Sequence, residues 1–224
     1  MIKKRSKIIS DLIMDKIDVL KAMQSLDFML EDVNDSEIQK WVKNELNGYK
    51  KKDEIPQYRE VQTLLIGDIQ VGYGLFKNVN IPVIDKDAIN MFSKTKIIEP
   101  LSTIIQMAKA ENEIEGHSLS LEVNTILVNH YQQTNGEVIT ARRKLGIYTY
   151  NNIVSNIKTK LLEIFKLLEK KYGNLDELYI DFSDNSKKDK VVKEMVEIIY
   201  YDNSINMGNN KEIRNSKVGG HDGN

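Results

Sequence analysis

Apolar residues recur at three- and four-residue steps through residues 7–31, the spacing of one face of an α-helix. This stripe consists of Ile8, Ile9, Leu12, Ile13, Ile17, Leu20, Met23 and Leu30. Residues 34–37 offer N-cap candidates for a second helix with apolar residues at Ile38, Trp41, Val42 and Leu46. Gly48 is placed to end that helix. The pattern predicts an antiparallel helical hairpin at the N-terminal end.

The pattern changes between residues 58 and 84, where short β-prone runs are separated by glycine. Residues 61–66 and 69–71 are such runs, and Val79, Ile81 and Val83 alternate with polar residues. Glycines at positions 67, 72 and 74 interrupt the segment, as turns or bulges do. We predict a small meander of two or three strands here.

Residues 85–114 return to a helical pattern, with Pro100 at the start of a new helix. Residues 119–131 alternate between apolar and polar, and residues 138–145 resemble a partner strand, which predicts a second hairpin. The longest helical stripe runs from Tyr150 to Leu168 and ends at Gly173. Residues 187–201 form a further helical pattern.

Together these patterns predict an α+β fold that is predominantly helical. It has an N-terminal helical hairpin, a small antiparallel sheet and long C-terminal helices. Residues 203–224 are rich in Asn, Gly, Ser and Lys, so we expect a flexible tail there. Its few apolar residues could instead add weak strands to a neighbouring protein.

The composition excludes several classes of site. The 224 residues include no cysteine, so disulfides, thiolate nucleophiles and Cys-based metal sites are absent. Lys and Arg number 32 against 33 Asp and Glu, so the chain has no overall basic character that would indicate nucleic-acid binding. No apolar run approaches the roughly 18 residues that cross a bilayer. We expect a cytoplasmic protein without a transmembrane segment.

Motifs for metal, phosphate or cofactor binding are also missing from the sequence. His117, His130 and His221 share no ligand spacing, and no phosphate-binding GxxxxGK[ST] loop occurs. Asp181, Asp184 and Asp189 cluster near the last helix, but an acidic turn at a helix start explains them better than a metal. We expect no cofactor, no metal and no recognisable catalytic site.

The segment from Trp41 to Arg59 is the most distinctive part of the chain. It holds the single tryptophan, and Glu45 follows Trp41 by four residues, which puts both on one helix face. The turn at Pro56 brings Arg59 back toward Glu45, so the two can pair as a structural clamp. Alternatively, the polar groups of Glu45, Tyr49, Tyr58 and Arg59 line a groove beside Trp41.

Basic clusters provide a second candidate site. Arg142, Arg143 and Lys144 are consecutive, and Tyr148 lies close enough in sequence to stack on a base. Against this, alternation along a strand would place Arg142 and Arg143 on opposite faces of a sheet. Solvated charge is the simpler explanation.

The order Trp-Val-x-x-Glu-Leu-x-Gly-Tyr, followed by Pro-x-Tyr-Arg, resembles the AbiTii family of bacterial abortive-infection proteins. It is carried here by Trp41, Val42, Glu45, Leu46, Gly48, Tyr49, Pro56, Tyr58 and Arg59. Residues 80–82 and the helix at 151–163 are similar to later family segments, although Lys158 stands where Arg is commoner. The resemblance divides the chain into an AbiTii-like domain at 5–175, a helical extension at 176–202 and the tail at 203–224.

The resemblance implies a cytoplasmic defence role that limits phage propagation, and it implies no particular reaction. Our leading hypothesis is a non-enzymatic module that binds a protein partner or an infection trigger. Its expected contact surface is Trp41, Glu45, Tyr49, Tyr58 and Arg59, which requires Trp41 to be partly exposed.

Two alternatives remain open. One is an RNA- or DNA-binding toxin or nuclease, which requires Arg142, Arg143, Lys144 and Tyr148 to converge in one cleft. The other is a structural or oligomerisation module, in which copies of the chain associate and the tail adds a strand to a partner.

Overall fold

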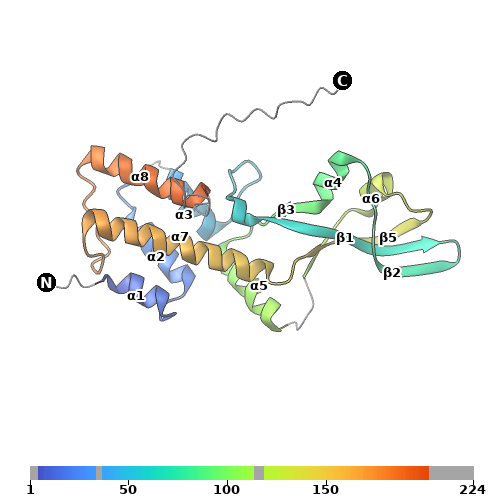
Figure 1. The fold of residues 1–224 in the computed structure, drawn as a ribbon, viewed down its shortest axis with the longest axis horizontal. Helices are drawn as coiled ribbons and strands as arrows, with labels where there is room; N and C mark the ends of the chain where they lie inside the picture. The colour runs from blue at the N-terminus through green and yellow to red at the C-terminus, as the bar shows by residue number, and fades with distance from the viewer. Residues whose placement is uncertain (1–4, 34–36, 114–118, 202–224) are drawn as a thin grey trace, which may run out of the picture.

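The computed structural model describes residues 5–33, 37–113 and 119–201. These residues form eight α-helices, one short 3₁₀ helix and five β-strands. Figure 1 shows an elongated molecule, with most of the helices at one end and the paired strands extending toward the other. The predicted α+β, mostly helical fold class is confirmed.

The helical end is built around the long helix α7, which runs from Thr149 to Tyr172. Helices α1, α2, α5 and α8 pack on it, and α3 packs on α2, α5 and α8. Their bounds are α1 Lys7–Ile13, α2 Val19–Met29, α3 Glu37–Asn47, α5 Leu101–Glu113 and α8 Asn185–Tyr200. Their apolar faces form one continuous core because each amphipathic helix must bury its stripe against another.

The first predicted helix is divided in two, which corrects the prediction for residues 7–31. The chain turns between α1 and α2 at Asp15, whose φ is +55°. Asp18 then caps α2 by accepting a hydrogen bond from the Lys21 backbone N–H at 2.7 Å. The second predicted helix is α3, and Gly48 follows it with φ of +88°, the left-handed conformation that favours glycine.

The sheet is antiparallel, with strand order β2-β1-β5-β4 and β3 paired to the start of β1. The strands are β1 Glu60–Val71, β2 Gly74–Asn80, β3 Lys94–Lys96, β4 Ser120–Glu122 and β5 Glu137–Leu145. A second, smaller core includes Leu65 and Ile69 of β1, Phe92 of α4 (Lys86–Ser93) and Val128 of α6 (Thr125–Tyr131). The sheet therefore has its own apolar core, separate from that of the helical end.

The predicted meander corresponds to the β1–β2 hairpin, but the second predicted hairpin is wrong in part. Only residues 120–122 of its first strand are extended, and residues 125–131 form α6. The reason is local: the Asn124 side chain accepts a hydrogen bond from the Ile126 backbone N–H at 2.9 Å and so begins a helix. The predicted partner strand is β5, which pairs mainly with β1.

The segment between α4 and α5 was predicted to be helical, but it is not a helix. Ile97 lies in the irregular segment between β3 and α5, where its N–H donates to the Arg59 carbonyl at 2.9 Å. At the other end, Val191, Met195 and Ile199 of α8 are buried in the same core as α7. The division of the chain at 175 stays a prediction, and the predicted tail at 203–224 lies outside the described residues.

Candidate functional site

The Trp41–Arg59 segment forms a buried hydrogen-bonded network around the Glu45 carboxylate. Glu45 Oε1 accepts hydrogen bonds from the hydroxyls of Tyr49 and Tyr58, both at 2.7 Å, and from Arg59 Nε at 3.0 Å. Glu45 Oε2 accepts from Arg59 Nη2 at 2.6 Å. The carboxylate thus has four donors, and its pairing with arginine is bidentate.

Arg59 ends the 3₁₀ helix η1, Gln57–Arg59, and ties three segments together. Besides Glu45 on α3, its Nη1 donates to the carbonyls of Ile97 at 2.9 Å and Glu99 at 2.8 Å, just before α5. The guanidinium also lies 4.9 Å from the centroid of the Tyr49 ring. Both charges are fully buried, and a buried ion pair is tolerated when its remaining polar atoms are also bonded, as here.

The electrostatics of the network follow from this burial. Burial by itself would lower the pKa of Arg59, but the Glu45 carboxylate outweighs it and raises that pKa. Burial and then the Glu45 charge raise the pKa values of Tyr49 and Tyr58 well above their usual range. The tyrosines therefore remain neutral hydrogen-bond donors, and the network carries one positive and one negative charge.

Trp41 adds one more hydrogen bond to the network, through Tyr58. Its Nε1–H donates to the Tyr58 hydroxyl at 2.8 Å, and the side chain has no exposed surface. Trp41, Glu45 and Arg59 are fully buried and Tyr49 is nearly so, which contradicts the expectation that Trp41 is partly exposed. Partner binding by these residues stays a prediction. The predicted Glu45–Arg59 clamp is confirmed. A buried carboxylate must find its donors within the protein, and the hydroxyls of Tyr49 and Tyr58 and the Arg59 guanidinium supply them.

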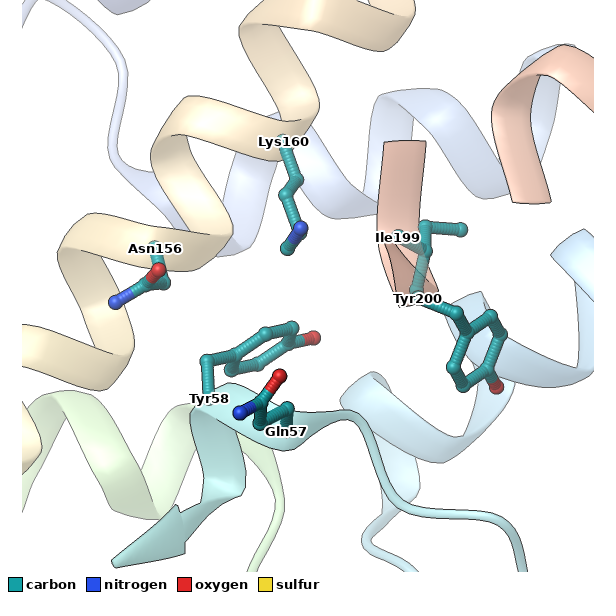
Figure 2. Close-up of a pocket in the computed structure, with 6 residues that line it drawn as sticks. All are labelled: Gln57, Tyr58, Asn156, Lys160, Ile199 and Tyr200. Carbon is teal, nitrogen blue, oxygen red and sulfur yellow. The ribbon is translucent and has the colours of Figure 1, made fainter. Parts of the chain in front are cut away.

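Tyr58, one of the residues that carry the family resemblance, lines a cavity. One pocket of about 170 Å³ is lined by Gln57, Tyr58, Asn156, Lys160, Ile199 and Tyr200. Figure 2 shows these side chains coming from η1, α7 and the end of α8. The Lys160 Nζ donates to the Ile198 carbonyl at 2.7 Å and lies 5.7 Å from the centroid of the Tyr58 ring.

Sequence reasoning missed this pocket, although it singled out two of the chain segments that line it. Residues 57–58 belong to the motif around Pro56, and Asn156 and Lys160 belong to the helix at 151–163. Both stretches resemble the family in sequence, and the fold brings them together. Nothing in the sequence indicated that Ile199 and Tyr200 of α8 would close the third side.

The basic candidate residues on β5 are divided between the two faces of the sheet. Arg143 pairs with Leu65, whose side chain belongs to the sheet core, whereas Arg142 pairs with Ile66 on the opposite face. Lys144 shares the face of Arg142 and is exposed. The cleft that the nucleic-acid alternative requires is therefore not formed.

The contacts of the two arginines confirm their separation. Arg142 donates to the side-chain carbonyl of Asn78 on β2, and Arg143 donates to the backbone carbonyl of Met91 on α4 at 2.7 Å. Partial burial lowers the pKa of Arg143. Tyr148 lies exposed beyond the strand, in a left-handed conformation just before α7. The prediction that these residues converge is wrong.

An exposed apolar cluster lies at the far end of the β1–β2 hairpin, which we call the hairpin tip: Val71, Tyr73, Leu75 and Phe76. The turn is tight because Gly72, with φ of +57°, follows the last residue of β1. Tyr73 is fully exposed, and the other three are about half exposed. Figure 1 shows the tip at the opposite end of the molecule from α1 and α8.

The described residues form neither a metal-ligand cluster nor a membrane-spanning helix. Across residues 5–33, 37–113 and 119–201, no group of three or more His, Cys, Asp or Glu side chains is arranged to hold a metal ion. In the same residues, no helix has the length and apolar character needed to cross a membrane.

Comparison with known proteins identifies the family. No curated protein and no solved structure matches the chain. The AbiTii family model matches residues 6–194, most of the chain. The match includes the clamp and the pocket residues of η1 and α7, but not Ile199 and Tyr200. This match suggests a role in abortive-infection defence. The chain belongs to the AbiTii family.

Proposed function

We propose that this protein is a cytoplasmic antiphage defence module of bacteria that acts by binding a protein partner through the hairpin tip. Family membership supports the defence role. The observation that carries the binding role is the exposed apolar cluster of Val71, Tyr73, Leu75 and Phe76. Exposed apolar patches on folded proteins mark surfaces that associate with other molecules.

The tip has the properties of a preorganised contact. Its two strands are paired up to Val71 and Gly74, and Ile69, just behind the tip, is buried in the sheet core. The tip residues therefore need little ordering on binding, which is the main cost of a flexible contact. Aromatic side chains such as Tyr73 and Phe76 are the residue types that dominate binding energy at interfaces.

The charge on β2 favours contact at the tip over pairing along the strand edge. β2 is an edge strand, and it carries Lys77 and an irregular residue, Asn78, with φ of +54°. A lysine and a backbone irregularity both discourage addition of another strand. The partner is therefore expected to cover the apolar tip.

The test is phage challenge of bacteria that produce equal amounts of each variant. The wild type should reduce plaque numbers for at least one phage of a broad panel. Tyr73→Ser/Phe76→Ser should lose that protection because the apolar contact is removed. Tyr179→Ser is the matched control, since Tyr179 is also an exposed tyrosine outside a helix but lies in the loop before α8.

Three results would contradict the proposal. Absence of protection by the wild type against the whole panel would argue against the defence role. Full protection by the tip variant would exclude the tip as the contact. Equal loss with Tyr179→Ser would show that the effect is not specific to the tip.

A further inference from the structure

The pocket beside Tyr58 has a rigid floor. The Tyr58 hydroxyl donates to Glu45 at 2.7 Å and accepts from Trp41 Nε1 at 2.8 Å, so the ring is held from behind while one face borders the cavity. Figure 2 shows Lys160 and Gln57 on either side of this ring. A side chain fixed in this way loses little conformational entropy when a ligand stacks on it.

The walls of the pocket divide into a charged side and an apolar side. Lys160 is the only charged residue among its six lining residues, and Gln57 and Asn156 supply amide groups. Ile199 and the Tyr200 ring form the opposite wall. Such a site is matched by a planar apolar ring with a hydrogen-bonding group at one end.

Charges outside the pocket set the orientation of a ligand. Burial, followed by the carboxylates of Glu54, Glu37, Glu45 and Asp53, raises the pKa of Tyr200 to about 12. A negative group beside Tyr200 would be repelled by these carboxylates. A negative group at the Lys160 end would instead be attracted by the ammonium.

We propose that this pocket binds a small monocyclic aromatic carboxylate. The ring lies between Tyr58 and Tyr200, and the carboxylate lies against the Lys160 ammonium. The cavity of about 170 Å³ fits one ring with a small substituent, since an enclosed cavity of about 150 Å³ accommodates benzene. This ligand site is separate from the hairpin tip and does not depend on the proposed partner.

The single tryptophan provides a sensitive test. Trp41 does not line the pocket and has no exposed surface, but its indole N–H bonds to Tyr58, so its one indole resonance reports on the floor of the site. The uniformly ¹⁵N-labelled full chain is titrated with benzoate and, separately, with benzamidine. These probes share a ring and a planar substituent but carry opposite charge.

Benzoate should shift the indole resonance in a saturable way, and benzamidine should not. Lys160→Met should weaken benzoate binding by about tenfold or more, the scale of one charge-assisted hydrogen bond. Lys160→Arg keeps the charge and should retain most of the affinity. Lys166→Met is the matched control, because Lys166 is exposed on the same helix and does not line the pocket.

Several outcomes would overturn the proposal: no saturable response to benzoate, equal responses to both probes, or unchanged benzoate binding by a folded Lys160→Met. Thermal unfolding of each variant is measured first. If Lys160→Met does not fold, Gln57→Ala, at an exposed position of the lining, replaces it and should also weaken binding. Tyr73→Ser should bind benzoate as the wild type does, which separates this test from that of the hairpin tip.

Discussion

The two ends of the molecule treat their polar and apolar side chains in opposite ways. At the helical end, the Glu45 and Arg59 charges and the Trp41 ring are fully buried, and the polar groups bond to one another. At the sheet end, Tyr73 is fully exposed and Phe76 is about half exposed. The difference indicates that Trp41, Glu45 and Arg59 stabilise the fold, whereas the hairpin tip is available to another molecule.

The same contrast holds for arginine. Arg59 has a carboxylate partner and two carbonyl acceptors, all within 3.0 Å. Arg143 is partly buried, donates to one backbone carbonyl, and has no ion pair among the described residues. A complete set of partners marks a structural role, and we expect substitutions at the two ends to separate stability from activity.

The largest effect is expected for Arg59→Ala. It leaves the Glu45 carboxylate buried without its ion partner, which costs about 3–5 kcal/mol of unfolding free energy. Urea denaturation followed by circular dichroism measures this. The control is Lys94→Ala, whose pair with Glu60 is roughly half exposed and should contribute less than about 1 kcal/mol. Similar losses for the two variants would contradict a structural clamp.

A smaller loss is expected for Trp41→Phe. The change removes the hydrogen bond to Tyr58 and leaves a small cavity, at a cost of about 1–3 kcal/mol. The same denaturation measurement applies. A neutral result would mean that the indole hydrogen bond and its packing do not stabilise the helical end.

A third test concerns the hydrogen bonds that link the start of α1 to Glu169 of α7. Glu169 accepts hydrogen bonds from the backbone N–H and hydroxyl of Ser6 at 2.6 and 2.7 Å and from Arg5 at 2.7 Å. Burial opposes ionisation, but the bonds to Ser6 and then Arg5 outweigh it and lower the pKa of Glu169 from 4.5. The stability from this carboxylate is therefore present above pH 4.5 and is lost as pH falls through the lower folded-state pKa.

Glu169→Gln should accordingly be less stable than the wild type near neutral pH, by about 1–3 kcal/mol. The difference should narrow in acid, where the wild-type carboxylate becomes protonated. Denaturation curves across this pH range measure it. A difference that stays constant with pH would show that the charge of Glu169 contributes nothing.

The smallest effect on stability is expected at the hairpin tip. Tyr73 is fully exposed, so Tyr73→Ser should change the unfolding free energy by no more than about 0.5 kcal/mol. A loss as large as that of Trp41→Phe would mean that Tyr73 packs within the protein and would remove the contrast between the two ends.

The sequence predicted features whose physical signals are local. Glu45 and Arg59 are close in the chain, and the turn at Pro56 brings them together, so their pairing followed from spacing. The end of α3 followed from Gly48. In the first predicted helix, Asp18 was an available N-cap signal, but the apolar periodicity continued across the turn and hid the break.

Features that depend on distant segments could not be predicted. The carbonyls of Ile97 and Glu99 that bind Arg59 are backbone atoms, which any residue type supplies. The pocket joins Tyr58 to Lys160 and Tyr200, three positions whose proximity depends on the packing of α7 and α8. Periodicity showed that those helices have apolar faces, but it carried no information on how they pack together.

The most direct test of the clamp is a double-mutant cycle between Glu45 and Arg59, measured as unfolding free energies of Glu45→Leu, Arg59→Met and the double variant. Each single change leaves one buried charge unpaired, whereas the double change removes both charges. We predict that the double variant is more stable than the sum of the single losses implies, by about 2–3 kcal/mol. Losses that add within about 0.5 kcal/mol would contradict the clamp, because independent residues behave additively.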